Sequence, residues 1–254
     1  MDDRVTRAGI TPPSMRLVLH DERAPGRLTL ALIERLIQAL RADTDAVAVT
    51  LEGVDVFCDG LDLTTLVDTG PGGHAAVQLE RFGELLDAIA MAPRPVIALV
   101  DGSARGGGLG VAAAADLIIA TSRATFGLPE GLFGLVPALA FPVLARRVGP
   151  VRARWLALSG TSVNAAEAWR LGLVDELTEN LDGSLHGHLR RLSRMDPRAV
   201  AALKAMSVVH DVAPASYRAQ AVAQFRHLCE SDATRERVTR FMAGETPWPE
   251  APEP

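Results

Sequence analysis

The sequence predicts an α/β fold, with strands and helices alternating along the first half of the chain and helices filling most of the second half. Short apolar, β-branched runs alternate with segments of helical periodicity from about residue 15 to residue 121. Beyond residue 138 nearly every segment has helical spacing. A dense cluster of glycines separates a strand from a helix near the middle of the chain. This pattern favours a layered α/β core.

Length and composition fit a globular protein. The chain has 254 residues, 48% of them hydrophobic, which is enough to bury a sizeable core. A net charge of −5 and the absence of a basic stripe interleaved with aromatic residues argue against a nucleic-acid partner. We find no apolar run of about 20 residues and no apolar leader, so we expect no membrane span and no signal peptide. Two cysteines, Cys58 and Cys229, make no disulfide framework, and we expect a cytoplasmic protein.

The elements of the first half follow from their apolar patterns. In the first predicted helix the apolar residues recur at helical spacing, from Leu28 to Leu40. The predicted elements are a strand at 15–20, a helix at 28–40, a strand at 46–51, a helix at 74–90, a strand at 96–100, a helix at 111–115 and a strand at 116–121. Between them, Asp68 to Gly73 (DTGPGG) is predicted to be a mobile loop.

The second half is predicted to be mostly helical. Its expected helices cover residues 141–148, 151–158, 165–171, 185–194, 199–210, 217–229 and 234–242. The first 13 residues read as a loose lead-in, and the proline-rich stretch 247–254 reads as a loose tail. There is no internal repeat and no composition break that would mark a second independent domain.

The glycine cluster lies in the stretch from Val100 to Gly110 (VDGSARGGGLG), which has five glycines between residues 102 and 110. It follows the apolar strand that begins at Pro95 and precedes an alanine-rich helix. Glycines at such a switch let the backbone approach a ligand closely and leave its N–H groups free. The ligand would be a phosphate or a developing oxyanion.

Common motifs do not account for this stretch. The spacing GxGxxG of a dinucleotide site is absent, and no Lys-Ser/Thr pair follows the glycines as in a phosphate-binding Walker loop. The residue two after Ser103 is Arg105 rather than glycine, so the G-x-S-x-G motif of a hydrolase nucleophile elbow is absent as well. The six histidines show no HExxH motif and the two cysteines are far apart, so we expect no metal site.

Glu130 is the one carboxylate in a strongly apolar run, between Leu128 and Leu132. A buried carboxylate without a partner has a raised pKa, and an acid of that kind is suited to proton transfer. Alternatively, Glu130 caps a helix or pairs with an arginine such as Arg146 or Arg147. The residues by themselves leave both interpretations open.

Several motifs in order resemble the crotonase (enoyl-CoA hydratase/isomerase) superfamily. They are VFCDGLDL, IALVDGSARGGGLGVAAAADLIIATSRATFGLPEGLFGLVP, VGPVRARWLALSGTSVNAAEAWRLGLVDEL and RERVTRFMAGETP, and together they cover nearly the whole chain. The resemblance implies a spiral of ββα turns over residues 14–195, a helical C-terminal region over 196–246, and assembly as a trimer or a dimer of trimers.

The resemblance also implies a site. Two backbone N–H groups, which by motif position belong to Leu61 and Gly107, would form an oxyanion hole for the carbonyl of a thioester. Hydratases of this family carry two glutamates. Glu130 matches the second, whereas the first falls on Gly110, which has no carboxylate. This departure argues against simple hydration of straight-chain enoyl-CoA. The family needs no cofactor beyond the phosphopantetheine that carries the substrate.

Within the superfamily, FGLPEGLFGLVPA and PVLARRVG look closest to the hydratase-like dehydratases of polyketide β-branching. That resemblance implies loss of water from 3-hydroxy-3-methylglutaryl on an acyl carrier protein, giving 3-methylglutaconyl. The chain departs from ordinary hydratases at ERAPGRLTLALIERL, where they favour Asn-Ala before the helix. The alternatives are an enoyl-CoA hydratase or double-bond isomerase that acts on acyl-CoA, and a non-catalytic auxiliary subunit.

Three further side chains are candidates for substrate contact. His74 and Glu80 fall in the region that forms the pocket wall in the family. Arg105 is either an ordinary surface arginine or a residue that meets an anionic substrate or the phosphopantetheine arm. Asp59 and Asp62 flank the Leu61 segment, and we expect them to serve turns or caps.

Overall fold

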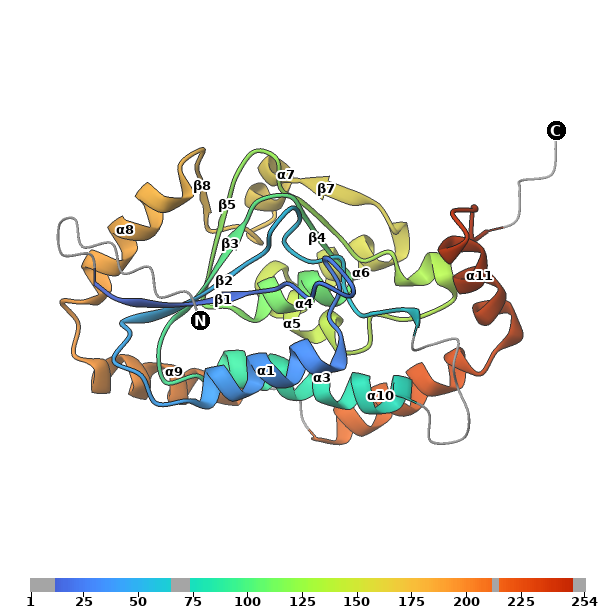
Figure 1. The fold of residues 1–254 in the computed structure, drawn as a ribbon, viewed down its shortest axis with the longest axis horizontal. Coiled ribbons are helices and arrows are strands. Elements are labelled where there is room, and N and C mark those ends of the chain that lie inside the picture. The colour runs from blue at the N-terminus through green and yellow to red at the C-terminus, as the bar shows by residue number, and fades with distance from the viewer. Residues whose placement is uncertain (1–11, 65–73, 212–214, 249–254) are drawn as a thin grey trace.

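A parallel five-stranded sheet lies at the centre of the computed structural model, which describes residues 12–64, 74–211 and 215–248 (Figure 1). All neighbouring strands in it are parallel. Its strands, in spatial order, are β1 (Ser14–Val18), β2 (Ala48–Glu52), β3 (Val96–Val100), β5 (Leu117–Ala120) and β8 (Glu176–Leu177). The parallel order places the ends of β3 and β5 side by side, and the glycine stretch leaves the sheet from the end of β3.

A second, smaller sheet holds the glycine stretch. It consists of β4 (Ser103–Arg105), β6 (Thr125–Gly127) and β7 (Ser162–Asn164), with β4 parallel and β7 antiparallel to β6. Arg105 is in register with Gly127, which brings the glycine stretch next to the segment that leads to Glu130.

The chain winds through these two sheets as a spiral. One turn runs through β3, β4 and the helix α4 (Gly107–Ala114), and the next runs through β5, β6 and the short 3₁₀ helix η1 (Glu130–Phe133). Bridges between Cys58 and Ala104, and between Leu28 and Leu61, stack successive turns on one another. This arrangement confirms the predicted α/β fold with a spiral of ββα turns.

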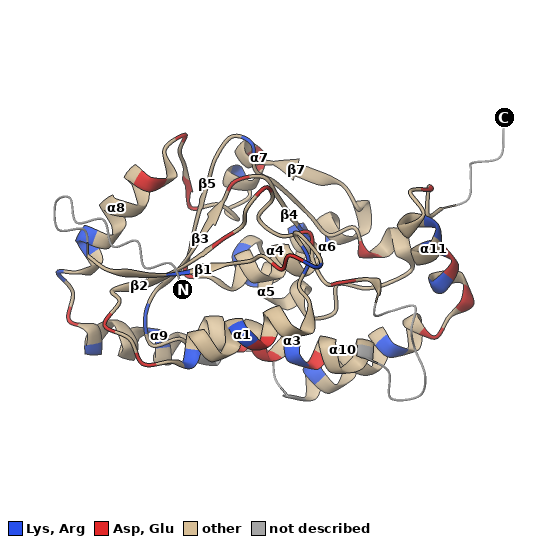
Figure 2. Cartoon of the chain, viewed as in Figure 1, with Lys and Arg blue, Asp and Glu red and all other residues tan. Residues whose placement is uncertain are grey.

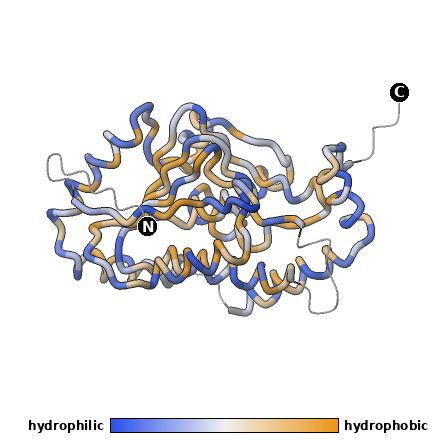
Figure 3. Tube along the Cα trace, viewed as in Figure 1, coloured by the Kyte–Doolittle hydropathy of each residue, from blue (hydrophilic) through white to orange (hydrophobic). Residues whose placement is uncertain are grey.

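The large sheet is buried on both faces. Alternate residues of its strands join two different apolar clusters: Val49, Val96 and Ala98 belong to the main core, whereas Ala48 and Ile97 belong to a second cluster. The second cluster includes Leu185 and Leu189 of α8 (Leu181–Leu192), which therefore covers that face. Figure 3 shows the central strands as a hydrophobic block between more hydrophilic outer helices.

The helices agree closely with those predicted. Besides α4 and α8, the α-helices are α1 (Leu30–Arg41), α3 (His74–Met91), α5 (Ala140–Val148), α6 (Pro150–Ser159), α7 (Ala165–Arg170), α9 (Pro197–Asp211), α10 (Ala215–Cys229) and α11 (Asp232–Met242). In α1 the buried residues are those of the predicted apolar stripe, and Thr29 caps the helix by accepting a hydrogen bond from the Leu32 amide at 3.1 Å.

Two expectations for the glycine stretch are corrected. The helix predicted to begin at residue 111 starts four residues earlier, at Gly107, because glycines are tolerated where a buried helix must approach a neighbouring backbone. The sequence does not predict the strands β4, β6, β7 and β8, since runs of two or three residues carry no readable alternation. The predicted mobile loop at 68–73 lies outside the described residues.

Charged contacts tie the C-terminal helices to the rest of the chain. Lys204 of α9 is buried and forms an ion pair with Asp116, and Arg218 of α10 pairs with Asp87 of α3. The predicted boundary between the spiral and the C-terminal region, at residue 196, falls between α8 and α9.

Figure 2 shows acidic and basic residues interspersed along α11. Within the described ranges no helix is long and apolar enough to cross a membrane.

Candidate active site

The start of α4 is pressed against the segment that contains Leu61, and glycine makes this possible. A β-carbon on Gly108 would lie 2.0 Å from the carbonyl oxygen of Cys58, closer than any real contact. Gly106, the residue before the helix, has φ of 53°, in the region that favours glycine. The glycines therefore serve a close approach between two backbone segments.

This approach brings together the two predicted amide groups. A β-carbon on Gly107 would lie 3.5 Å from the nitrogen of Leu61, and a β-carbon on Gly60 would lie 3.2 Å from the nitrogen of Gly107. In the described part of the chain neither the Leu61 nor the Gly107 nitrogen donates a hydrogen bond to protein. Gly107 is also the first residue of α4, where backbone N–H groups lack partners within the helix. Both donors are available to a ligand oxygen.

Glu130 lies beside this pair. Its Oε1 is 3.2 Å from the position of a β-carbon on Gly106, and its Oε2 is buried without a hydrogen-bond partner among the described residues. Burial raises the pKa of Glu130 from 4.5 to about 7. The carboxyl group is held at the start of η1, which Gly134 closes in a left-handed conformation. An acid with this pKa can both accept and return a proton near neutral pH.

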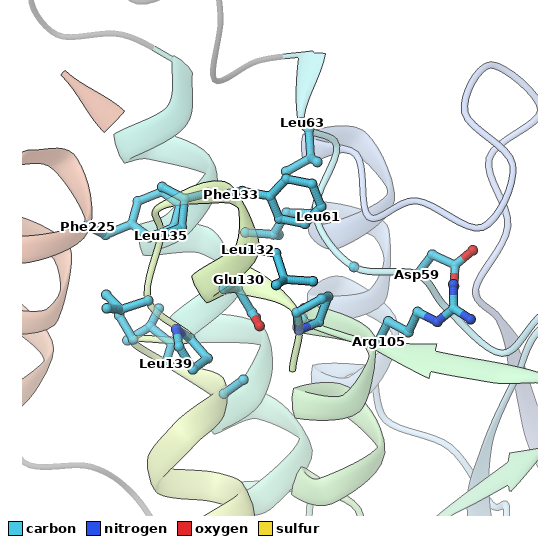
Figure 4. Close-up of a pocket in the computed structure, with 18 of the residues that line it drawn as sticks. Asp59, Leu61, Leu63, Arg105, Glu130, Leu132, Phe133, Leu135, Leu139 and Phe225 are labelled. Carbon is cyan, nitrogen blue, oxygen red and sulfur yellow. The ribbon is translucent and has the colours of Figure 1, made fainter. Parts of the chain in front are cut away.

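These groups line one cavity of about 330 Å³. Figure 4 shows Glu130 between an apolar side, with Leu135, Leu139 and Phe225, and a charged side with Asp59 and Arg105. Most of the other lining side chains are aliphatic or aromatic. A largely apolar cavity with a few polar groups is the usual form of a site for a small organic group.

Little room is left at Gly110, the position where hydratases of the family carry their other glutamate. A β-carbon on Gly110 would lie 3.0 Å from the β-carbon of Ala140 and 3.2 Å from Cζ of Phe82. Gly110 itself is buried within α4. The helix therefore packs against its neighbours at the point where the hydratase pattern has its first glutamate. Among the described residues that line the cavity, Glu130 is the acid whose carboxyl group has a buried oxygen without a partner.

The structure brings most of the predicted site residues together. Leu61, Gly107, Glu130 and Arg105 all line the cavity. Glu80 does not, because it lies on the exposed side of α3. His74 begins α3, and its side chain lies outside the described residues.

Of the two arginines that the sequence offers as ion-pair partners for Glu130, Arg147 already has other partners. The Nη1 of Arg147 pairs with Asp175 at 2.9 Å, and its Nε donates to the carbonyl oxygen of Ala113 at 3.0 Å, so this arginine is engaged elsewhere. The expected local role is found for Asp62, whose carboxylate accepts hydrogen bonds from Thr64. Asp59 instead accepts a hydrogen bond from the Ser103 hydroxyl at 2.6 Å, and this bond joins two successive turns of the spiral.

Sequence reasoning missed several lining residues. Arg27 lines the cavity, and so do Phe225, Phe241 and Trp248 from the C-terminal region. The ring of Phe241 stacks edge-to-face on Phe133 of η1, with ring centroids 4.9 Å apart. Residues 247 and 248 were expected to belong to a loose tail, but residue 247 is buried and both line the cavity. No local pattern signals a contact of such long range.

Comparisons with known proteins agree with this fold. The model of the enoyl-CoA hydratase/isomerase family matches residues 15–250. The chain is 31% identical to bacillaene synthase dehydratase PksH of Bacillus subtilis over 91% of this chain and 92% of that one. It is 34% identical to the probable enoyl-CoA hydratase EchA17 of Mycobacterium tuberculosis, covering 69% of this chain and 68% of the other.

Solved structures of proteins named as enoyl-CoA hydratases have the same fold as this chain. The crystal structure of PksH from Bacillus subtilis superimposes with a TM-score of 0.82 at 28% identity, covering 93% of this chain and 95% of that one. An enoyl-CoA hydratase from Mycobacterium avium superimposes with a TM-score of 0.81 at 28% identity, covering 92% of each chain.

Proposed function

Because the chain belongs to the enoyl-CoA hydratase/isomerase family, we propose that it is an acyl-thioester dehydratase. Its substrate in this proposal is 3-hydroxy-3-methylglutaryl on an acyl carrier protein, and its product is 3-methylglutaconyl on the same carrier. The observation that carries the proposal is the acid Glu130, whose carboxyl group has a buried oxygen, beside two backbone N–H groups that have no partner among the described residues. The similarity to a bacillaene synthase dehydratase supports loss of water as the reaction.

The reaction uses these groups in turn. The N–H groups of Leu61 and Gly107 bind the thioester oxygen, which gains negative charge when the Glu130 carboxylate removes a proton from the α-carbon. The enolate then re-forms the carbonyl, a C=C bond forms between the α- and β-carbons, and the C–O bond at the β-carbon breaks. Glu130 returns its proton to the departing hydroxyl group, which leaves as water. One acid serves both transfers when both groups lie on the same side of the substrate.

The limited room at Gly110 supports proton transfer by one acid. Ala140 and Phe82 leave little room for a second carboxylate there, so a single acid carries both proton transfers, whichever way the reaction runs. The cavity is apolar around Glu130, which keeps the carboxyl group ready to carry a proton. No cofactor is part of this proposal, because the phosphopantetheine arm belongs to the substrate.

The test is direct. The protein is incubated with 3-hydroxy-3-methylglutaryl-carrier protein, and the intact mass of the carrier is followed. We expect a loss of 18 mass units with the wild type and no loss with Glu130→Ala. Unchanged mass with the wild type, together with hydration of an enoyl-CoA, would assign the alternative activity. A shifted double bond without a change in mass would assign an isomerase.

We also propose that the chain forms a stable homo-oligomer. Val151, Trp155 and Leu158 are exposed on α6 and lie at i, i+4 and i+7, so they form one apolar stripe. Burying that stripe between copies fits the trimer or hexamer that the family resemblance implies. Light scattering should give a trimeric or hexameric mass, and Leu158→Glu should lower it.

A further inference from the structure

Arg105 lies at the charged side of the cavity, two residues before Gly107. It is the last residue of β4, and its amide donates to the carbonyl oxygen of Cys58 at 2.8 Å, which fixes its backbone against the Leu61 segment. Its side chain is exposed and lines the cavity. An anionic group of a substrate held at Leu61 and Gly107 would therefore lie within reach of this guanidinium.

The guanidinium of Arg105 has no partner among the residues that the structure describes. In the part of the chain that the structure describes, it forms no ion pair and no hydrogen bond. Arg27 is the other cationic residue that lines the cavity, but its Nη1 donates to the carbonyl oxygen of Asp59 at 3.1 Å. Arg105 is thus the cation of the described cavity wall that has no donor in use, whereas Arg27 has one of its five donors in use.

The proposed substrate carries anions that need such a donor. Its acyl group ends in a carboxylate, and its carrier arm contains a phosphate. Apart from Arg27, which the Asp59 carbonyl oxygen holds through one Nη1 hydrogen bond, every other part of the described cavity wall is apolar, polar and neutral, or acidic. A carboxylate or phosphate placed away from these two arginines would lose hydration without gaining a charged donor. A guanidinium matches both anions in geometry, since it can donate two parallel hydrogen bonds.

We infer that Arg105 is a specificity-determining residue, which binds an anionic oxygen group of the substrate at the charged side of the cavity. The inference rests on the proposed function, since that function supplies the anion. Asp59 lies on the same side in Figure 4, where its carboxylate opposes the anion and is restrained by the Ser103 hydroxyl. The balance between Arg105 and Asp59 then sets how strongly an anion is preferred.

Binding of unreactive thioesters separates this inference from catalysis. The probes are 3-methylglutaryl-CoA and 3-methylbutyryl-CoA, which lack the leaving hydroxyl and differ in the distal carboxylate, together with the N-acetylcysteamine thioesters of the same acids, which lack all phosphates. Dissociation constants are measured by calorimetry for the wild type, Arg105→Gln, Arg105→Lys and Asp59→Asn. Arg41→Gln, which removes an exposed arginine at the end of α1, is the matched control.

We expect Arg105→Gln to weaken binding of the anionic probe by roughly tenfold or more, Arg105→Lys to recover part of this, and Asp59→Asn to strengthen it by a few fold. A loss confined to both 3-methylglutaryl probes assigns the distal carboxylate, and a loss confined to both CoA probes assigns a phosphate. Equal binding by wild type and Arg105→Gln for all four probes overturns the inference. Failure of the wild type to dehydrate the hydroxylated substrate would instead refute the proposed function, with these dissociation constants unaffected.

Discussion

The carboxylate oxygen Oε1 of Glu130 lies 3.2 Å from the position that a β-carbon would take on Gly106. Gly106 precedes the first residue of α4, so the acid stands at the positive end of a helix dipole, which favours the carboxylate form. The pKa of Glu130 is nevertheless raised to about 7, because burial opposes the charge more strongly. This balance leads to the first three predictions.

Replacing Glu130 by glutamine should remove the proton carrier with little change in shape. We expect kcat/KM for dehydration to fall by roughly 10²–10⁴, which is the usual contribution of a general acid–base group. Circular dichroism should show an unchanged fold. Glu22→Gln, in an exposed loop, is the control and should retain wild-type turnover. A comparable loss in the control would show that the assay reports folding rather than catalysis.

The rate should depend on pH through the same group. Dehydration begins with Glu130 as the carboxylate, so kcat/KM should rise with pH and level off above an apparent pKa of about 7. The profile is measured with the hydroxylated thioester between pH 5 and 9, a range of roughly two units on either side of that pKa. A rate that falls through this range would show that the protonated acid starts the reaction.

Stability should also depend on the protonation of Glu130. Its pKa is higher in the folded chain than the ordinary value of 4.5, so the folded state binds more protons and loses stability as pH rises from about 4.5 to about 7. Glu130→Gln removes this dependence. We therefore expect the variant to be more stable than the wild type above pH 7, by up to roughly 3 kcal/mol, and to lose this advantage at acidic pH. Urea unfolding at several pH values measures the difference.

Gly110 should resist even a methyl group. Its β-carbon would press on Ala140 and Phe82, both in the core, so we expect Gly110→Ala to destabilise the fold by about 1–2 kcal/mol. Gly187 lies in α8 with nothing within 4 Å of a β-carbon, and Gly187→Ala should stabilise by about 0.5–1 kcal/mol. Gly110→Glu should give little folded protein. Folded, hydrating Gly110→Glu enzyme would contradict the closed packing described for α4.

The ion pair between Lys204 and Asp116 should hold α9 to the sheet. Lys204 is buried, and the Asp116 carboxylate also accepts a hydrogen bond from the Val96 amide at 2.7 Å. We expect Lys204→Met to destabilise the fold by about 1–3 kcal/mol. Adding Asp116→Asn should cost less in that variant than in the wild type, as a double-mutant cycle in urea would show. Additive effects would mean that the two side chains act independently.

Much of the fold and half of the site could be predicted from the sequence. Helical periodicity placed nearly all the helices, because a buried stripe repeats over several turns. The glycine density before α4 and the isolated acid at Glu130 indicated a site with free amides and one proton carrier. The motifs that resemble the family then assigned the amides to Leu61 and Gly107, and the structure brings these segments together.

Tertiary structure alone decided the rest, since it depends on which segments pack together. The strands β4, β6 and β7 are too short to show alternation, and they form through pairing with distant segments. Phe241 and Trp248 reach the cavity because α11 packs on η1. The sequence by itself showed that Gly110 lacks a carboxylate. Packing of α4 against Ala140 and Phe82 decided that even a β-carbon there would be tighter than an ordinary contact, because a close-packed core leaves little room for added atoms.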